Sequence, residues 1–127
     1  MIENNENMNL STIHFIGIGG IGLSAIAKLC LHNGYNVQGS DIKNSDTIEE
    51  LINMGIKVSV GHNSNNINTE IEKVIYSSAV NSKNPEFIKA KDLNIPIYSR
   101  AQILAEVMQK KKSICIPPIL IKNDFIT

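Results

Sequence analysis

The chain has 127 residues, enough for one globular domain with a single core, and its 43% hydrophobic and 19% charged residues are ordinary for a soluble domain. Its 12 basic residues are balanced by 12 acidic ones, so it lacks the positive field needed to neutralise a nucleic-acid backbone. No apolar run approaches the ~18 residues of a membrane helix, and the polar start does not resemble a signal peptide. We expect no nucleic-acid partner, no membrane association and a cytoplasmic location.

Strand-like and helical patterns alternate along most of the chain. Residues 1–11 are expected to form a flexible leader. The β-rich runs are Leu10–Ile16, Tyr35–Gly39, Ile56–Val60, Lys73–Tyr76 and Ile95–Tyr98. The helical patterns are Ile21–His32, Ser45–Met54, Pro85–Leu93 and Arg100–Gln109. This alternation predicts an α/β fold, a Rossmann-like open parallel sheet of about five strands with helices on both faces.

Two kinds of potentially reactive side chain are interpreted as structural. Cys30 and Cys115 lie far apart and match no metal-binding spacing. Cys30 also falls within an apolar helical pattern, where a buried thiol behaves as a small hydrophobic group. His14 alternates with apolar neighbours in the first strand. We therefore expect these three side chains to stabilise the fold.

A glycine-rich turn joins the first strand to the first helix. Gly17, Gly19 and Gly22 form a Gly-x-Gly-x-x-Gly pattern, which allows a tight turn and close approach of a diphosphate to the amino end of the helix. Asp41, at the end of the second strand, is placed to accept hydrogen bonds from ribose hydroxyls. This arrangement also fits an NAD-binding regulatory module. Glycines needed only for packing, and Asp41 as an ordinary turn residue, are the structural alternatives.

More specific motifs follow one another in a fixed order. The doubled Gly19-Gly20 is followed by Ser24. The later motifs are Gly39-Ser40-Asp41, Gly61-His62, Ser77-Ser78-Ala79-Val80, Asn84-Pro85-Glu86, Ser99-Arg100-Ala101 and Leu104-Ala105-Glu106. In these motifs residues 12–116 resemble the amino-terminal domain of the Mur ligase family, in particular its UDP-N-acetylmuramate–L-alanine ligases. A Rossmann-like binding domain is expected over residues 12–112.

The resemblance implies that the chain binds the UDP part of UDP-N-acetylmuramic acid in a ligase of peptidoglycan synthesis. The residues that it implicates lie at strand ends or at the start of a helix: Gly17, Gly19, Gly20, Gly22, Ser40, Asp41, His62, Ser78, Ala79 and Arg100. The four glycines would offer backbone N–H groups to the diphosphate, and Ser40 and Asp41 would lie beside the uridine. His62 as a solvated loop residue, Arg100 as the partner of a surface carboxylate and Asn84-Pro85-Glu86 as a plain helix start are the alternatives.

The sequence departs from the family pattern after Ile116. Where the family has a Gly-Thr-His-Gly-Lys-Thr-Thr loop for ATP, this chain has Pro117-Pro118, and proline has no N–H to offer a phosphate. Residues 113–127 are therefore interpreted as a divergent tail where the ATPase domain would begin. ATP and Mg²⁺ belong to that domain in the intact family. We expect no cofactor in this chain and no ligase activity from it alone. A truncated or frame-disrupted gene product or a cloned domain would fit, and ligase domains on a separate chain are a candidate partner.

Overall fold

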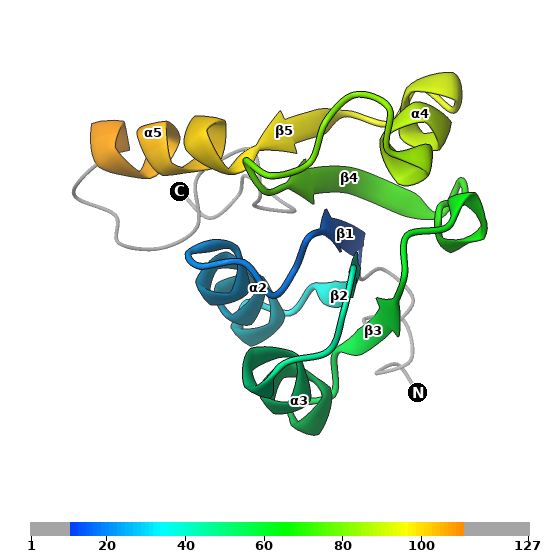
Figure 1. Cartoon of the computed structure of the whole chain (residues 1–127). Helices are drawn as coiled ribbons and strands as arrows, with labels where there is room; N and C mark the ends of the chain where they lie inside the picture. Colours follow the sequence, from blue (N-terminus) through cyan, green and yellow to red (C-terminus); the bar gives the residue numbers. More distant parts are fainter. Residues whose placement is uncertain (1–10, 111–127) are drawn as a thin grey trace, which may run out of the picture.

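The computed structural model describes residues 11–110, with side chains as far as Ala105. A five-stranded parallel sheet in the order β3-β2-β1-β4-β5 forms its centre (Figure 1). The strands are β1 (Thr12–Ile16), β2 (Asn36–Asp41), β3 (Lys57–Val60), β4 (Ile71–Tyr76) and β5 (Ile97–Ser99). β1 lies at the centre of the sheet. The chain adds β2 and β3 on one side of β1 and then crosses over to add β4 and β5 on the other side, so the strand order reverses between β1 and β4.

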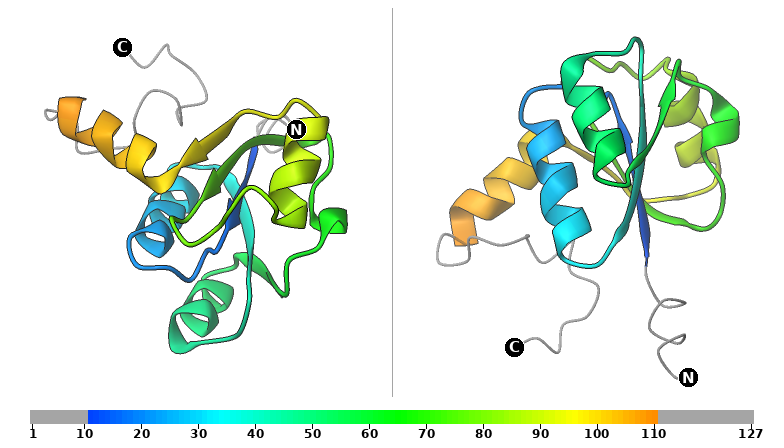
Figure 2. Two further views of the ribbon diagram at one scale, coloured as in Figure 1. Left: turned by 45° about the horizontal axis from the view of Figure 1, so that its top comes forward. Right: turned by 90° about the horizontal axis from the view of Figure 1, so that it is seen from below.

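Helices cover both faces of the sheet, as expected from the sequence. The helices are α2 (Leu23–His32), α3 (Asp46–Asn53), α4 (Pro85–Asp92) and α5 (Arg100–Lys110), with a short 3₁₀ helix η1 (Ser64–Asn66). Figure 2 shows α2 and α3 on one face of the sheet and α4 on the other. Phe15 and Ile103 belong to the core under α2 and α3, whereas Ile16 and Ala90 belong to the core under α4.

Several predicted boundaries are confirmed by their capping contacts. The Ser45 side chain accepts a hydrogen bond from the Ile48 amide at the start of α3, and Asn84 does the same for Glu86 at the start of α4. Gly34 and Gly55 have positive φ angles just after α2 and α3, where left-handed backbone ends a helix. Turn chemistry therefore sets where these helices begin and end.

The predicted start of the first helix is wrong by two residues. Ile21 is 94% exposed and lies in a turn, and α2 begins at Leu23. Gly22 explains the difference, because its φ of 87° and ψ of −41° are not helical. The expected structural roles of His14 and Cys30 are confirmed, since both are fully buried. Cys115, residues 1–10 of the expected leader and the tail 113–127 lie outside the described residues.

Candidate functional site

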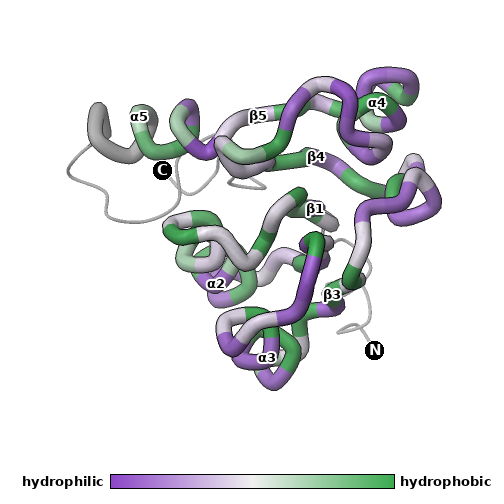
Figure 3. The backbone as a smooth tube through the Cα atoms, viewed as in Figure 1, coloured by the Kyte–Doolittle hydropathy of each residue, from purple (hydrophilic) through white to green (hydrophobic). Residues whose placement is uncertain are grey.

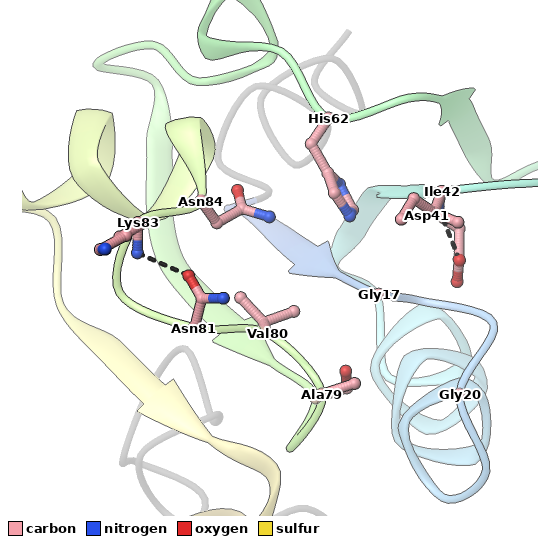
Figure 4. A pocket seen from close by; sticks show the side chains of 11 residues that line it. Gly17, Gly20, Asp41, Ile42, His62, Ala79, Val80, Asn81, Lys83 and Asn84 are labelled. Atoms are coloured by element: carbon pink, nitrogen blue, oxygen red, sulfur yellow. Dashed lines mark hydrogen bonds between the residues drawn. The ribbon is translucent and has the colours of Figure 1, made fainter.

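A pocket of about 530 Å³ lies at the carboxyl ends of β1, β2 and β4 (Figure 4). This is where the strand order reverses, the usual ligand position in an open α/β sheet. Five residues predicted from the sequence line it: Gly17, Gly20, Asp41, His62 and Ala79. The remaining lining residues were not predicted as binding residues: Ile42, Ser77, Val80, Asn81, Lys83 and Asn84. Its volume is in the range of small-molecule sites.

The glycine loop forms one wall of this pocket, and several of its amides are used internally. The Gly17 amide donates to the Ser40 carbonyl at 2.8 Å, and the Gly20 amide donates to the Gly17 carbonyl at 3.0 Å. Within residues 11–110 no hydrogen-bond acceptor faces the amides of Ile21 and Gly22. They precede the first turn of α2, where the helix dipole favours an anion. The loop therefore keeps two donors at the mouth of α2.

Asp41 ties the end of β2 to the glycine loop. Its Oδ2 accepts a 2.8 Å hydrogen bond from the Gly19 amide, and its Oδ1 accepts one of 2.7 Å from the Ile42 amide. A β-carbon on Gly19 would lie 2.9 Å from Asp41 Oδ2 and from Ile48 Cδ1. Gly19 thus lets the loop approach β2 and α3 closely without displacing the side chains of Asp41 and Ile48.

His62 follows β3, and its ring points into the pocket (Figure 4). Its Nδ1 lies 2.8 Å from Ser40 Oγ. Ser40 is completely buried and does not line the pocket, so it contributes to the site through His62.

Glu86 is a charged group beneath the pocket that the sequence analysis did not select. Its side chain is completely buried and accepts hydrogen bonds from His14 and Ser40 at 2.7 Å each. Burial by itself raises the pKa of Glu86. The hydrogen bond and charge of His14, with hydrogen bonds from Asn66 and Ser40, outweigh burial and lower that pKa to about 2. The carboxylate is therefore ionised inside the domain.

Comparison with known proteins identifies the family of the chain. The family profile described as "Mur ligase family, catalytic domain" matches residues 12–112. The chain belongs to the Mur ligase family. The described part of this Mur ligase domain contains no helix long and apolar enough to cross a membrane.

Relatives of this Mur ligase domain are much longer proteins. UDP-N-acetylmuramate–L-alanine ligase from Desulforamulus reducens is 49% identical over 105 residues, which are 82% of this chain and 23% of the relative. The enzyme of the same name from a Sulfurihydrogenibium species is 52% identical over 104 residues, again 82% of this chain and 23% of the relative. The crystal structure of UDP-N-acetylmuramate–alanine ligase from Thermotoga maritima aligns with a TM-score of 0.74 at 36% identity, over 80% of this chain and 23% of that one.

The other predicted residues of the Mur ligase domain lie around the pocket but do not line it. Arg100 begins α5 and packs against the glycine loop, since a β-carbon on Gly22 would lie 3.2 Å from its Nη1. Its guanidinium is therefore beside the amino end of α2. Ser78 is exposed in the turn after β4, next to Ala79. Gly19 and Gly22 belong to the glycine loop but are not among the residues that line the pocket.

Proposed function

We propose that residues 12–112 bind the UDP part of UDP-N-acetylmuramic acid, as the substrate-binding domain of a cytoplasmic ligase of peptidoglycan synthesis. The observation that supports this most directly is that Gly17 and Gly20 of the glycine loop line one pocket with Asp41 and His62, at the switch point of the sheet. The substrate class comes from the two relatives whose names contain UDP-N-acetylmuramate. The chain aligns with 23% of the length of each of them.

The proposed diphosphate position is the mouth of α2. The amides of Ile21 and Gly22 supply donors there, and the guanidinium of Arg100 packs against Gly22. Arginine suits this place because its forked donors match phosphate oxygens. The carboxylate of Asp41 already holds the Gly19 amide, so we place the diphosphate toward Gly22.

The proposed uridine position lies between the end of β2 and the segment after β4. Asp41 there offers carboxylate oxygens to ribose hydroxyls. Ile42, which is 68% exposed although it lines the pocket, and Val80 provide apolar surface for the flat face of a pyrimidine. A polar rim around apolar walls is typical of nucleotide sites.

Titration of the ¹⁵N-labelled chain with UDP-N-acetylmuramate, UDP and NADH tests this proposal. We expect both uridine nucleotides to shift the amide signals of the glycine loop and His62, and NADH to leave them unchanged. Gly20→Val should abolish these shifts, because Gly20 lines the pocket and its β-carbon would lie 3.3 Å from the Gly17 carbonyl oxygen and 3.6 Å from Ser77 Cβ. Ala25→Leu adds three carbon atoms, as Gly20→Val does, to the exposed side of α2 and serves as the matched control. A folded protein that binds NADH and ignores uridine nucleotides refutes the proposal.

A further inference from the structure

A buried polar network links the interior of the domain to the ring of His62. Glu86 Oε1 accepts hydrogen bonds of 2.7 Å from His14 Nε2 and from Ser40 Oγ. Glu86 Oε2 accepts one of 2.9 Å from the Asn63 amide and one of 2.7 Å from Asn66 Nδ2. The loop after β3 and the segment that leads into α4 are largely hydrophilic (Figure 3), and α4 contacts η1 within that loop. Both oxygens of the carboxylate are saturated with donors.

The single proton of the Ser40 hydroxyl decides how His62 is protonated. An ionised carboxylate only accepts hydrogen bonds, so Ser40 must donate its proton to Glu86. The Ser40 oxygen can then only accept from His62, whose Nδ1 lies 2.8 Å away. In the neutral ring the proton therefore resides on Nδ1, and Nε2 carries a lone pair.

Nε2 is the ring atom left for a ligand. Within the described chain no residue hydrogen-bonds to it, and the side chain keeps 14% of its surface exposed where the ring points into the pocket (Figure 4). A lone pair at this position attracts a donor. Phosphate oxygens are acceptors, whereas a nucleoside carries donors in its ribose hydroxyls and in the imide N–H of uracil.

We propose that Glu86 is a positioning residue that acts through Ser40 to hold neutral His62 as the Nδ1–H tautomer, so that its Nε2 accepts a hydrogen bond from a nucleoside donor. This inference rests on the proposed uridine site. It assigns His62 to recognition of the nucleoside, and leaves the diphosphate to the glycine loop and Arg100. The opposite tautomer would require Ser40 to turn its proton toward His62, and would forfeit the charge-assisted hydrogen bond to Glu86.

The tautomer is measured directly from the imidazole ¹⁵N shifts of the ligand-free protein at alkaline pH, where histidine is neutral. The wild-type ring is expected to carry its proton on Nδ1. Glu86→Gln should reverse this. The Asn63 amide cannot turn away, so the glutamine oxygen takes the place of Oε2 and its NH₂ group faces Ser40 and His14. His14 Nε2 then accepts from this NH₂ group, and the His14 proton moves to Nδ1, where the Gln38 side-chain amide turns to present its oxygen. Ser40 then accepts from the amide and donates to His62, whose proton moves to Nε2.

We call the hydrogen-bond chain from Glu86 through Ser40 to His62 the relay. Two serine variants distinguish loss of the relay from general damage to the sheet. Ser40→Ala removes the link, so His62 should populate both tautomers and UDP affinity should fall several-fold. Ser59→Ala removes a hydroxyl from the residue paired with Ser40 on β3, whose own contact is a 3.4 Å hydrogen bond to Asn66. Ser59→Ala should change neither the tautomer nor the affinity.

Analogues of UDP identify the donor that His62 recognises. Wild-type protein should bind at least one of N3-methyl-UDP, 2′-deoxy-UDP and 3′-deoxy-UDP about tenfold more weakly than UDP, the cost of one lost hydrogen bond. The donor for His62 is the group whose loss matters less in Ser40→Ala than in the wild type, because a contact to Asp41 is the same in both proteins. An Nε2–H ring in the wild type, or an unchanged tautomer in folded Glu86→Gln, overturns the relay. Equal binding of all four nucleotides overturns the nucleoside contact. A wild type that binds no uridine nucleotide refutes the proposed function, while the ligand-free tautomer still decides the relay.

Discussion

The carboxylate of Asp41 accepts a 2.8 Å hydrogen bond from the backbone N–H of Gly19, 22 residues earlier in the chain. This contact closes the glycine loop over the end of β2. It also places a negative charge at one of the loop amides that would otherwise attract a phosphate. Asp41 therefore has two opposing effects on a nucleotide: it offers acceptors to ribose and repels the diphosphate.

Asp41→Asn is expected to separate these effects. The asparagine oxygen can still accept from Gly19, so the loop should keep its shape. Loss of the charged acceptor should weaken UDP binding about fivefold, because hydrogen bonds to charged groups are worth roughly 1 kcal/mol more than neutral ones. Pyrophosphate, which has no ribose, should bind equally or a few-fold more tightly. Isothermal titration with both ligands measures the difference.

Asp92→Asn is the control for the loss of one negative charge, since Asp92 is exposed at the end of α4 and does not line the pocket. It should leave both affinities unchanged. Equal losses of UDP and pyrophosphate affinity in Asp41→Asn would mean that the loop was damaged, and would contradict ribose recognition by Asp41.

The order and type of the strands and α-helices within residues 11–110 could be predicted because local signals mark them. Ser45 and Asn84 cap helices through their own side chains, and Gly34 and Gly55 end helices through their own backbone. The error at Ile21 arose where hydrophobic periodicity conflicted with a glycine. Gly22 adopts a non-helical conformation there, so the apolar side chain before it is exposed.

The candidate site was only partly predictable. Glycines and strand-end residues are visible in the sequence because their places follow from the βαβ pattern. Glu86 was interpreted as part of a helix start, which it is. Its burial depends on His14 and Ser40, which lie 72 and 46 residues away in sequence, and no local pattern shows that they meet.

Acid should destabilise the domain through Glu86. Its pKa is lowered from 4.5 to about 2 in the folded chain. A carboxyl with a depressed folded pKa stabilises the fold fully above its unfolded pKa, and that contribution is lost as pH falls toward the folded value. The free energy of unfolding should therefore decrease by about 3 kcal/mol between pH ~5 and ~2 on account of this group.

Urea denaturation at a series of pH values measures this loss, with Glu86→Gln as the reference. The variant should be less stable at neutral pH, because its amide cannot satisfy four donors. Its stability should also depend less on pH below ~5 than that of the wild type. Parallel pH profiles for the two proteins would show that Glu86 does not titrate in this window.

Gly39→Ala should destabilise the sheet by roughly 1–3 kcal/mol, the usual cost of overpacking. A β-carbon on Gly39 would lie 2.7 Å from the Phe15 carbonyl oxygen and 2.7 Å from Ile18 Cδ1. The Cδ1 atom of Ile18 can move by rotation, but Ile18 Cβ lies 2.8 Å away and the Phe15 carbonyl belongs to the paired strand β1. Gly55→Ala is the comparison, since it has open space and only the strain of a positive φ. A Gly39→Ala domain at least as stable as Gly55→Ala in urea would contradict this packing argument.

Cys30 should be chemically inert while the domain is folded. It is completely buried in α2, and burial raises its pKa to about 12 despite a smaller opposing effect of the Lys73 charge. Since the thiolate is the reactive form, modification requires unfolding. In a Cys115→Ser background, labelling by a thiol reagent at about pH 8 should be at least ~100-fold slower in buffer than in denaturing urea, and should rise in parallel with the unfolding curve. Rapid labelling in buffer, with the circular dichroism of the folded protein intact, would show that the α2 core opens locally and that Cys30 is not sealed within it.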